Sequence, residues 1–147
     1  MTYGSSSVLD SSLLWCPQSQ TTLKKGELEE FRRIYLASHY ISVANSSKQA
    51  GLKELAAMQL TSVLRYVGIV PADRAFYEAG LAWKEAGRPN MAFVLLNRFL
   101  DLCDAMDDPD SSAAVLENAD FADTDIPFDF HIPQRAYVHE DAREDVS

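Results

Sequence analysis

The turn at residues 87–90, Gly-Arg-Pro-Asn, constrains the fold of this chain more than any other feature. On both sides of it, apolar residues recur at three- and four-residue spacing, which is the period of an amphipathic α-helix. A connection this short can join two helices only as antiparallel neighbours. The sequence therefore predicts a helical hairpin. Its first helix begins with Pro71 and ends at Gly87, and its second helix runs to Met106.

A second pair of amphipathic stretches precedes this hairpin. One runs from Lys25 to Asn45 and the other from about Lys48 to Val67, and the polar residues 45–47 interrupt the pattern between them. We expect Gly68 to end the second stretch, because glycine adopts a left-handed conformation at low cost. On the first stretch, the residues at helical spacing that we expect to face inward are Leu28, Phe31, Tyr35, Ser38, His39 and Ser42.

The chain divides into three segments by composition. Residues 1–22 are rich in Ser, Thr and Gln, and we expect a flexible N-terminal arm. Residues 23–106 carry the helical pattern, and residues 107–147 form an acidic tail that we expect to be largely extended. Prolines in this tail argue against a central β-strand. Alternation places four apolar residues on one side of it, so we expect docking on the helices through Ile126, Phe128, Phe130 and Ile132.

Composition also narrows the classes of partner. The formal net charge is -9, with Asp+Glu 22 against Lys+Arg 13, whereas nucleic acids and anionic membranes select basic surfaces. No apolar run approaches the roughly 18 to 20 residues that cross a bilayer. Cys16 and Cys103 are too few for a disulfide framework or a zinc motif. We expect an intracellular protein with protein partners, no nucleic acid and no direct membrane insertion.

The sequence contains no recognisable motif for catalysis or for cofactor binding. No carboxylate stands at helical spacing to orient His39, which we expect to be a hydrogen-bonded core or groove residue, and His131 and His139 are expected on the surface. Acidic clusters at residues 101–110 and 120–125 lack the spacing and glycine of a calcium loop. Glycine-rich phosphate loops are also missing. We therefore expect a protein that is not an enzyme, with no metal, no cofactor and no small-molecule substrate.

The second predicted hairpin fits the tetratricopeptide pattern, in which small residues let two helices approach closely while large residues fill the surrounding space. Phe99 and Asp104 depart from the pattern, which has a small residue and a proline there. A bulky Phe99 suggests that the helical array ends here and that the tail covers its last face. The first hairpin fits less well. The motif residues are Phe76, Ala79, Gly80, Trp83, Gly87, Ala92, Leu96 and Phe99.

These observations predict an all-α fold of antiparallel helical hairpins, stacked as tetratricopeptide-like repeats in an α-solenoid fragment. Three longer strings add a family resemblance: DRAFYEAG at residues 73–80, NMAFVLLNRFLDL at residues 90–102 and DFADTDIPF at residues 120–128. They resemble the C-terminal region of the intraflagellar transport protein 172 family, and the resemblance covers roughly residues 31–146.

The resemblance implies a scaffold subunit of intraflagellar transport complex B, which carries cargo along the axoneme of cilia. Family members are expected to have N-terminal β-propellers and a long helical-repeat region. The implied partners are other intraflagellar transport proteins. The implied location is the cilium or flagellum and the basal-body cytoplasm.

Two functions stay open. In the first, the chain is a non-catalytic scaffold and protein-interaction module that supports cilium assembly and cargo transport. In the second, it is a regulatory module that positions a following U-box-like domain for ubiquitin-related binding or activity. The family resemblance implies such a domain after the point that matches Val146. Capture of a partner by this chain alone would favour the first function, and dependence on the following domain would favour the second.

Overall fold

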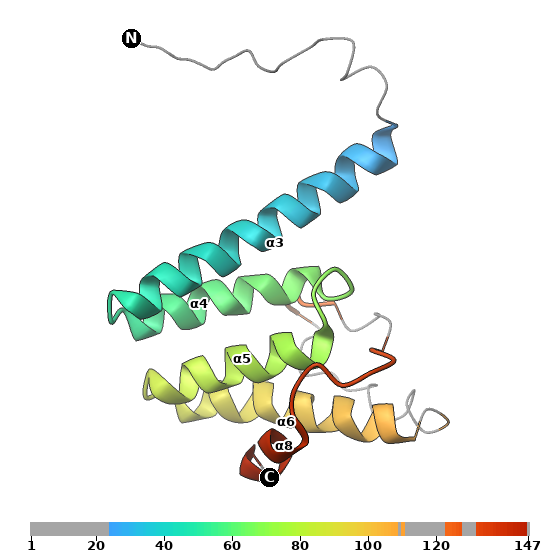
Figure 1. Cartoon of the computed structure of the whole chain (residues 1–147). Coiled ribbons are helices and arrows are strands. Elements are labelled where there is room, and N and C mark those ends of the chain that lie inside the picture. The colour runs from blue at the N-terminus through green and yellow to red at the C-terminus, as the bar shows by residue number, and fades with distance from the viewer. Residues whose placement is uncertain (1–23, 109, 111–122, 128–131, 147) are drawn as a thin grey trace. The chain divides into compact units, whose positions relative to one another are not determined.

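The computed structural model describes residues 24–108, 110, 123–127 and 132–146 (Figure 1). The expected N-terminal arm, residues 1–22, lies outside the described residues, as do Phe128 and Phe130. The chain divides into two units, residues 1–33 and 34–147, and each is considered by itself. Helix α3, Lys25–Gln49, crosses the boundary between them.

The described part of the first unit is the beginning of α3. The backbone N–H of Lys24 donates to Oε2 of Glu27 at 3.1 Å, which satisfies one amide at the start of the helix. An ion pair three residues apart follows, between Arg32 and Glu29 at 3.4 Å. Leu28 and Phe31 are exposed, and Phe31 keeps 67% of its surface accessible.

The regular secondary structure in the described residues of the second unit is helical. After residues 34–49 of α3 come α4 (Lys53–Val63), the 3-10 helix η1 (Leu64–Tyr66), α5 (Ala72–Glu85), α6 (Pro89–Asp107) and α8 (Glu140–Val146). Among the described residues there is only an isolated bridge between Val67 and Val70, and no strand. The predicted all-α class is therefore confirmed, with helices packed as antiparallel pairs. Stacking as tetratricopeptide-like repeats stays a prediction.

The expected break at residues 45–47 was wrong, because α3 continues through it to Gln49. Ser47 is buried, and its hydroxyl donates to the carbonyl of Val43 at 2.8 Å, so the helix itself satisfies this polar group. The helix ends instead at Gly51, which has a φ of 78°. Leu52 N–H donates to the Ser47 carbonyl at 2.9 Å, as in a Schellman motif. Consequently α4 begins at Lys53 rather than near residue 48.

The predicted inward face of α3 was also wrong. All six residues expected there, from Leu28 to Ser42, are exposed, and this includes His39. The buried positions are Ala37, Ala44 and Ser47, and the Tyr40 ring stacks on Tyr66 with centroids 6.2 Å apart. Apolar residues occur on both faces of this helix, so its period alone could not choose the packed one. Small residues on the buried face allow the neighbouring backbone to come close.

The second hairpin forms as expected, with α5 and α6 antiparallel and in contact along their lengths (Figure 1). Pro71 is the residue before α5 rather than its first helical residue. Gly87 ends the helix with a φ of 77°, and the N–H of Arg88 donates to the carbonyl of Trp83 at 2.9 Å. Pro89 then opens α6, where its missing N–H removes no helical hydrogen bond.

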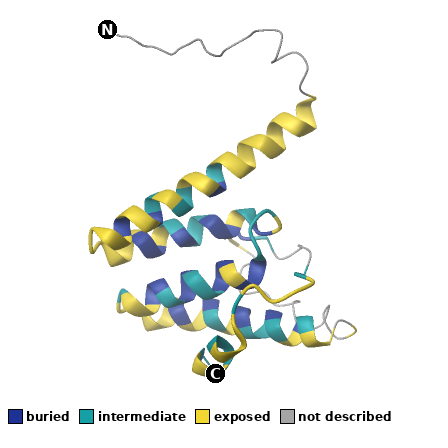
Figure 2. Ribbon diagram, in the orientation of Figure 1, coloured by how far each residue is buried: buried dark blue, intermediate teal, exposed yellow. Residues whose placement is uncertain are grey.

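The core lies between α4, α5 and α6, and Figure 2 shows buried residues concentrated on their facing sides. Phe76, Phe99, Leu64 and Leu102 are almost fully enclosed. The tail contributes Ile126 to this core, and Val138 and Val146 pack against it. No pattern in the sequence predicted α8, the seven-residue helix of the tail.

Candidate functional site

Helices α5 and α6 pack closely at Gly80. A Cβ atom placed on Gly80 would lie 2.6 Å from both Cγ and Cδ2 of Leu96 and 3.3 Å from its backbone nitrogen. The hydrogen side chain of Gly80 therefore allows this packing. Leu96 is half-buried, and Gly87 ends α5. The other predicted motif residues are buried, namely Phe76, Ala79, Trp83, Ala92 and Phe99.

One polar link joins α4 to α5. The indole Nε1–H of Trp83 donates to Oγ1 of Thr61 at 2.8 Å, and the Thr61 hydroxyl donates to the carbonyl of Ala57, also at 2.8 Å. Because Trp83 is only 8% exposed, its N–H needs this protein partner. The link therefore holds the Trp83 ring of α5 against Thr61 of α4.

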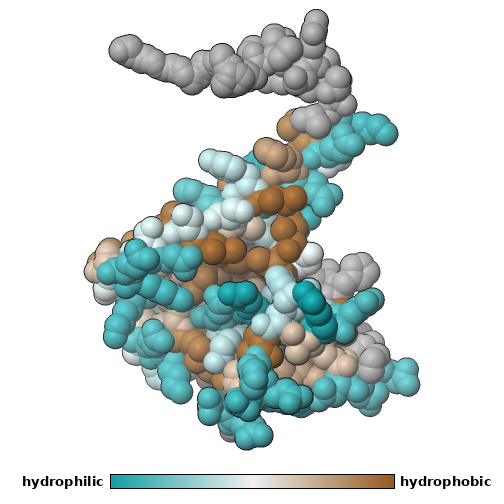
Figure 3. Space-filling model, viewed as in Figure 1, coloured by the Kyte–Doolittle hydropathy of each residue, from teal (hydrophilic) through white to brown (hydrophobic). Residues whose placement is uncertain are grey.

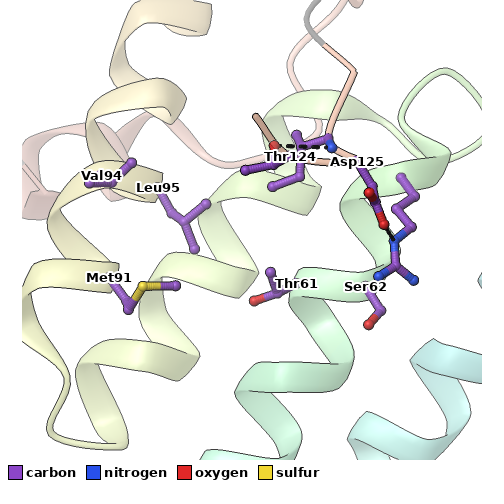
Figure 4. Close-up of a pocket in the computed structure, with 9 residues that line it drawn as sticks. Thr61, Ser62, Met91, Val94, Leu95, Thr124 and Asp125 are labelled. Atoms are coloured by element: carbon purple, nitrogen blue, oxygen red, sulfur yellow. Dashed lines mark hydrogen bonds and ion pairs between the residues drawn. The ribbon is translucent and has the colours of Figure 1, made fainter. Parts of the chain in front are cut away.

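A hollow of about 520 Å³ opens between α4 and α6, and we call it the α4–α6 groove (Figure 4). Leu95 is buried in the groove at 2% exposure, whereas Met91 and Val94 keep 44% and 37% of their surface accessible. The groove is lined by Thr61, Ser62, Arg65, Met91, Val94, Leu95, Thr124, Asp125 and Ile126.

Tail residues close one end of this groove. Arg65 Nε pairs with Oδ2 of Asp125 at 3.0 Å, and both side chains remain partly exposed. The backbone N–H of Ile126 donates to Oγ1 of Thr124 at 3.3 Å, which turns the chain so that Ile126 enters the core. The groove thus has apolar walls and a charged rim. Such a surface suits apolar side chains of a polypeptide better than it suits a charged small molecule.

A second hollow of about 230 Å³ lies beside α5 and is also largely apolar. Figure 3 shows hydrophobic surface over α4 next to hydrophilic side chains. At the edge of this second hollow, Arg74 Nε and Glu78 Oε2 form an ion pair of 2.5 Å. This hydrogen bond raises the pKa of Arg74 above its usual value. The lining residues are Ile41, Leu60, Val63, Val70, Pro71, Arg74, Ala75 and Glu78.

The four residues proposed for tail docking have different positions. Ile126 is 9% exposed and belongs to the core. Ile132 is half-buried and lines a hollow with residues 68–72. Phe128 and Phe130 lie outside the described residues.

In the described part of the chain, the side chains that could act in catalysis or bind a metal do not cluster. No set of three or more His, Cys, Asp or Glu residues there is placed to hold a metal ion. His39 is exposed, against expectation, with its ring edge-on to Tyr40, and His139 is exposed as expected. His131 lies outside the described residues. Burial raises the pKa of the Cys103 thiol, which reduces its nucleophilicity at neutral pH.

None of the described helices is long and apolar enough to span a bilayer.

Several residues that shape these surfaces were not predicted from the sequence. Asp73 is 1% exposed, and its Oδ2 accepts the backbone N–H of Tyr137 at 2.8 Å. An acidic residue in the first turn of a helix is ordinary, so its position gave no signal of this role. Met91 and Val94 lie beside the main apolar stripe of α6. Apolar residues outside the buried stripe of α6 were the one feature of the sequence that could have indicated the groove.

This chain is similar to a short part of much longer known proteins. It is 70% identical over 123 residues to intraflagellar transport protein 172 of Chlamydomonas reinhardtii, which covers 83% of this chain and 7% of that protein. The Mus musculus homolog is 50% identical over 121 residues, covering 80% of this chain and 7% of the homolog. Intraflagellar transport protein osm-1 of Caenorhabditis elegans is 35% identical over 127 residues, covering 79% and 7%. This chain therefore spans about 7% of the length of these curated relatives. No family model matches it.

Proposed function

Because this chain belongs to the intraflagellar transport protein 172 family, we propose that it is a non-catalytic scaffold and protein-interaction module of an intraflagellar transport complex B subunit. In this role it binds other intraflagellar transport proteins. It supports cilium assembly and cargo transport along the axoneme, in the cilium or flagellum and the basal-body cytoplasm. The observation that carries the proposal is the 70% identity over 83% of the chain.

The α4–α6 groove supports the interaction role. Its walls are apolar and two of its residues, Met91 and Val94, are accessible, so a partner can gain free energy by burying aliphatic side chains there. No nucleophile with an adjacent base is among its described residues. A surface of this kind recognises a segment of another protein and performs no chemistry on it.

Charged substitutions in the groove test this proposal. The double variant Met91→Glu/Val94→Glu places two carboxylates on apolar walls, where a partner would have to desolvate them. We expect capture of complex B proteins from ciliated cells by the immobilised chain to fall by about tenfold or more. The captured proteins are identified by mass spectrometry and compared with those on the unaltered chain. Circular dichroism checks that the variant stays folded, as expected for residues this exposed.

Phe93→Glu is the matched control. Phe93 lies on α6 between the two groove residues, is 67% exposed and does not line the groove. This variant should capture complex B proteins like the unaltered chain. Equal losses in both variants would show that the groove is not the binding surface. Capture that requires the following U-box-like domain would instead favour the regulatory role.

A further inference from the structure

Helix α8 is attached to the end of α6 through one arginine. Nη1 of Arg143 donates to Oδ2 of Asp107 at 2.5 Å, and Nη2 donates to Oδ1 of Asp104. The two carboxylates are three residues apart, so they stand on one face of α6. The hydrogen bond to Asp107 raises the pKa of Arg143 above its usual value, and the arginine remains charged at all relevant pH.

Apolar contacts and a second polar link complete the attachment. Val138 and Val146 pack against the core, and the Tyr137 N–H donates to Asp73. A hollow of about 90 Å³ remains beneath the tail, bordered by α6 and residues 136–143. We call the surface under this segment the α8 seat. It consists of Asp73, Phe99, Cys103, Asp104 and Asp107.

Arg143 complements the two carboxylates of the seat, but the net charge of α8 does not complement the end of α6. Helix α8 carries four acidic residues and one arginine, and the surface over it is hydrophilic in Figure 3. The last turn of α6 has Asp104 and Asp107 but no basic residue, and the C-terminal end of a helix dipole is itself negative. The acidic side chains of α8 are exposed, but the helix as a whole carries a net negative charge and lies beside an acidic helix end, where a cation is favoured.

The short length of α8 also limits how tightly it binds the seat. Helices of seven residues are unstable alone, so α8 persists only through its contacts with the seat. Arg143 is 38% exposed, and its two acidic partners are more than half exposed. Ion pairs this accessible to water contribute little to stability. A longer helix that offers the same contacts with fewer acidic residues would bind the seat more favourably.

We propose that the α8 seat is a docking surface for a basic amphipathic helix of a partner protein, and that α8 is a displaceable internal cap on it. The partner helix presents an arginine to Asp104 and Asp107 and an aliphatic residue three positions later, as Arg143 and Val146 do. Its remaining surface is neutral or basic. The net charge of -9 speeds the encounter with such a helix. This inference rests on the proposed interaction role, for which it names a second surface and its partner chemistry.

Alkylation of Cys103 by iodoacetamide reports whether α8 covers the seat. In a Cys16→Ser background, Arg143→Gln should release α8 and increase the alkylation rate several-fold by uncovering the half-buried thiol. The charge of Arg143 lowers the pKa of Cys103, so loss of that charge without release would raise the pKa and slow the reaction. The two outcomes have opposite signs. Slower or unchanged alkylation overturns the proposal, and Arg143→Lys should stay near the unaltered rate.

Peptide binding tests the partner chemistry. The probe is a fluorescent lysine- and alanine-rich helix of about 15 residues, with Arg and Val at the spacing of Arg143 and Val146. It should bind the Arg143→Gln chain about tenfold more tightly than the unaltered chain, because α8 no longer competes. Fluorescence anisotropy measures the affinity. A matched peptide with Gln in place of Arg keeps the lysines and should bind weakly to both chains.

The variant Asp104→Asn/Asp107→Asn distinguishes specific binding at the seat from nonspecific electrostatic attraction. We expect it to lose binding of the arginine peptide. Equal affinity of the peptide for all chains, or no preference for the arginine peptide, overturns the proposal. Because Met91 and Val94 lie outside the seat, such a failure would leave the groove experiment and the proposed function untouched.

Discussion

Side-chain size at a single position sets how closely α5 and α6 pack. At Gly80 the neighbouring Leu96 side chain already occupies the space that a methyl group would need. The sequence indicated a small residue here because the hairpin pattern requires one. The same pattern includes Leu96 among the residues around this contact. How closely Gly80 and Leu96 approach depends on the axial offset of the two helices, which no local pattern determines.

Gly80→Leu should destabilise the fold by roughly 1–3 kcal/mol or more, since the added atoms force Leu96 and the α6 backbone to move. Urea unfolding followed by circular dichroism measures this change. Adding Leu96→Ala makes room, so the double variant should be more stable than the sum of the two single effects predicts. A Gly80→Leu chain that unfolds at the wild-type urea concentration would contradict the close helix contact.

At the scale of helices, the points where α3 and α5 end are set by glycines with positive φ. Gly51 and Gly87 each allow the next residue's N–H to reach back to a carbonyl of the last helical turn. The sequence predicted the end at Gly87, where a turn and a proline agree. It missed Gly51, because the preceding polar residues 45–47 looked like a loop although they continue the helix.

Gly51→Val should destabilise the fold by about 1–2 kcal/mol, because a β-branched side chain clashes with its own backbone in the left-handed region. Gly51→Asn is the matched control and should cost clearly less, since asparagine tolerates this conformation. Thermal unfolding of both variants tests the comparison. Equal melting temperatures for valine and asparagine would show that Gly51 is not held at positive φ in solution.

In the second unit as a whole, the tail is joined to the helices through contacts between residues far apart in the chain. Tyr137 and Asp73 are separated by 64 positions, yet a hydrogen bond of 2.8 Å connects them. The described tail residues contribute Ile126, Val138 and Val146 to the packing around the core. The helix that each part of the tail contacts depends on how α4, α5 and α6 are positioned in the folded chain.

Asp73→Ala should increase amide hydrogen exchange at Tyr137, because that amide loses the carboxylate acceptor that it has in the structure. Amides within α5 and α6 should exchange at their original rates. Asp73→Asn keeps an acceptor oxygen and should preserve most of the protection. Exchange is measured by mass spectrometry at peptide resolution or by NMR. Unchanged protection at Tyr137 in the alanine variant would show that the tail is held elsewhere.

The sequence by itself determined the all-α class, the α5–α6 hairpin and the enclosed positions of Phe76, Trp83 and Ala92. These follow from helical period, turn length and glycine placement, which act between residues close in the chain. Only the tertiary structure decided which face of α3 packs, where α8 lies and how the α4–α6 groove forms. Each of these depends on a neighbouring surface that exists only after distant segments have come together.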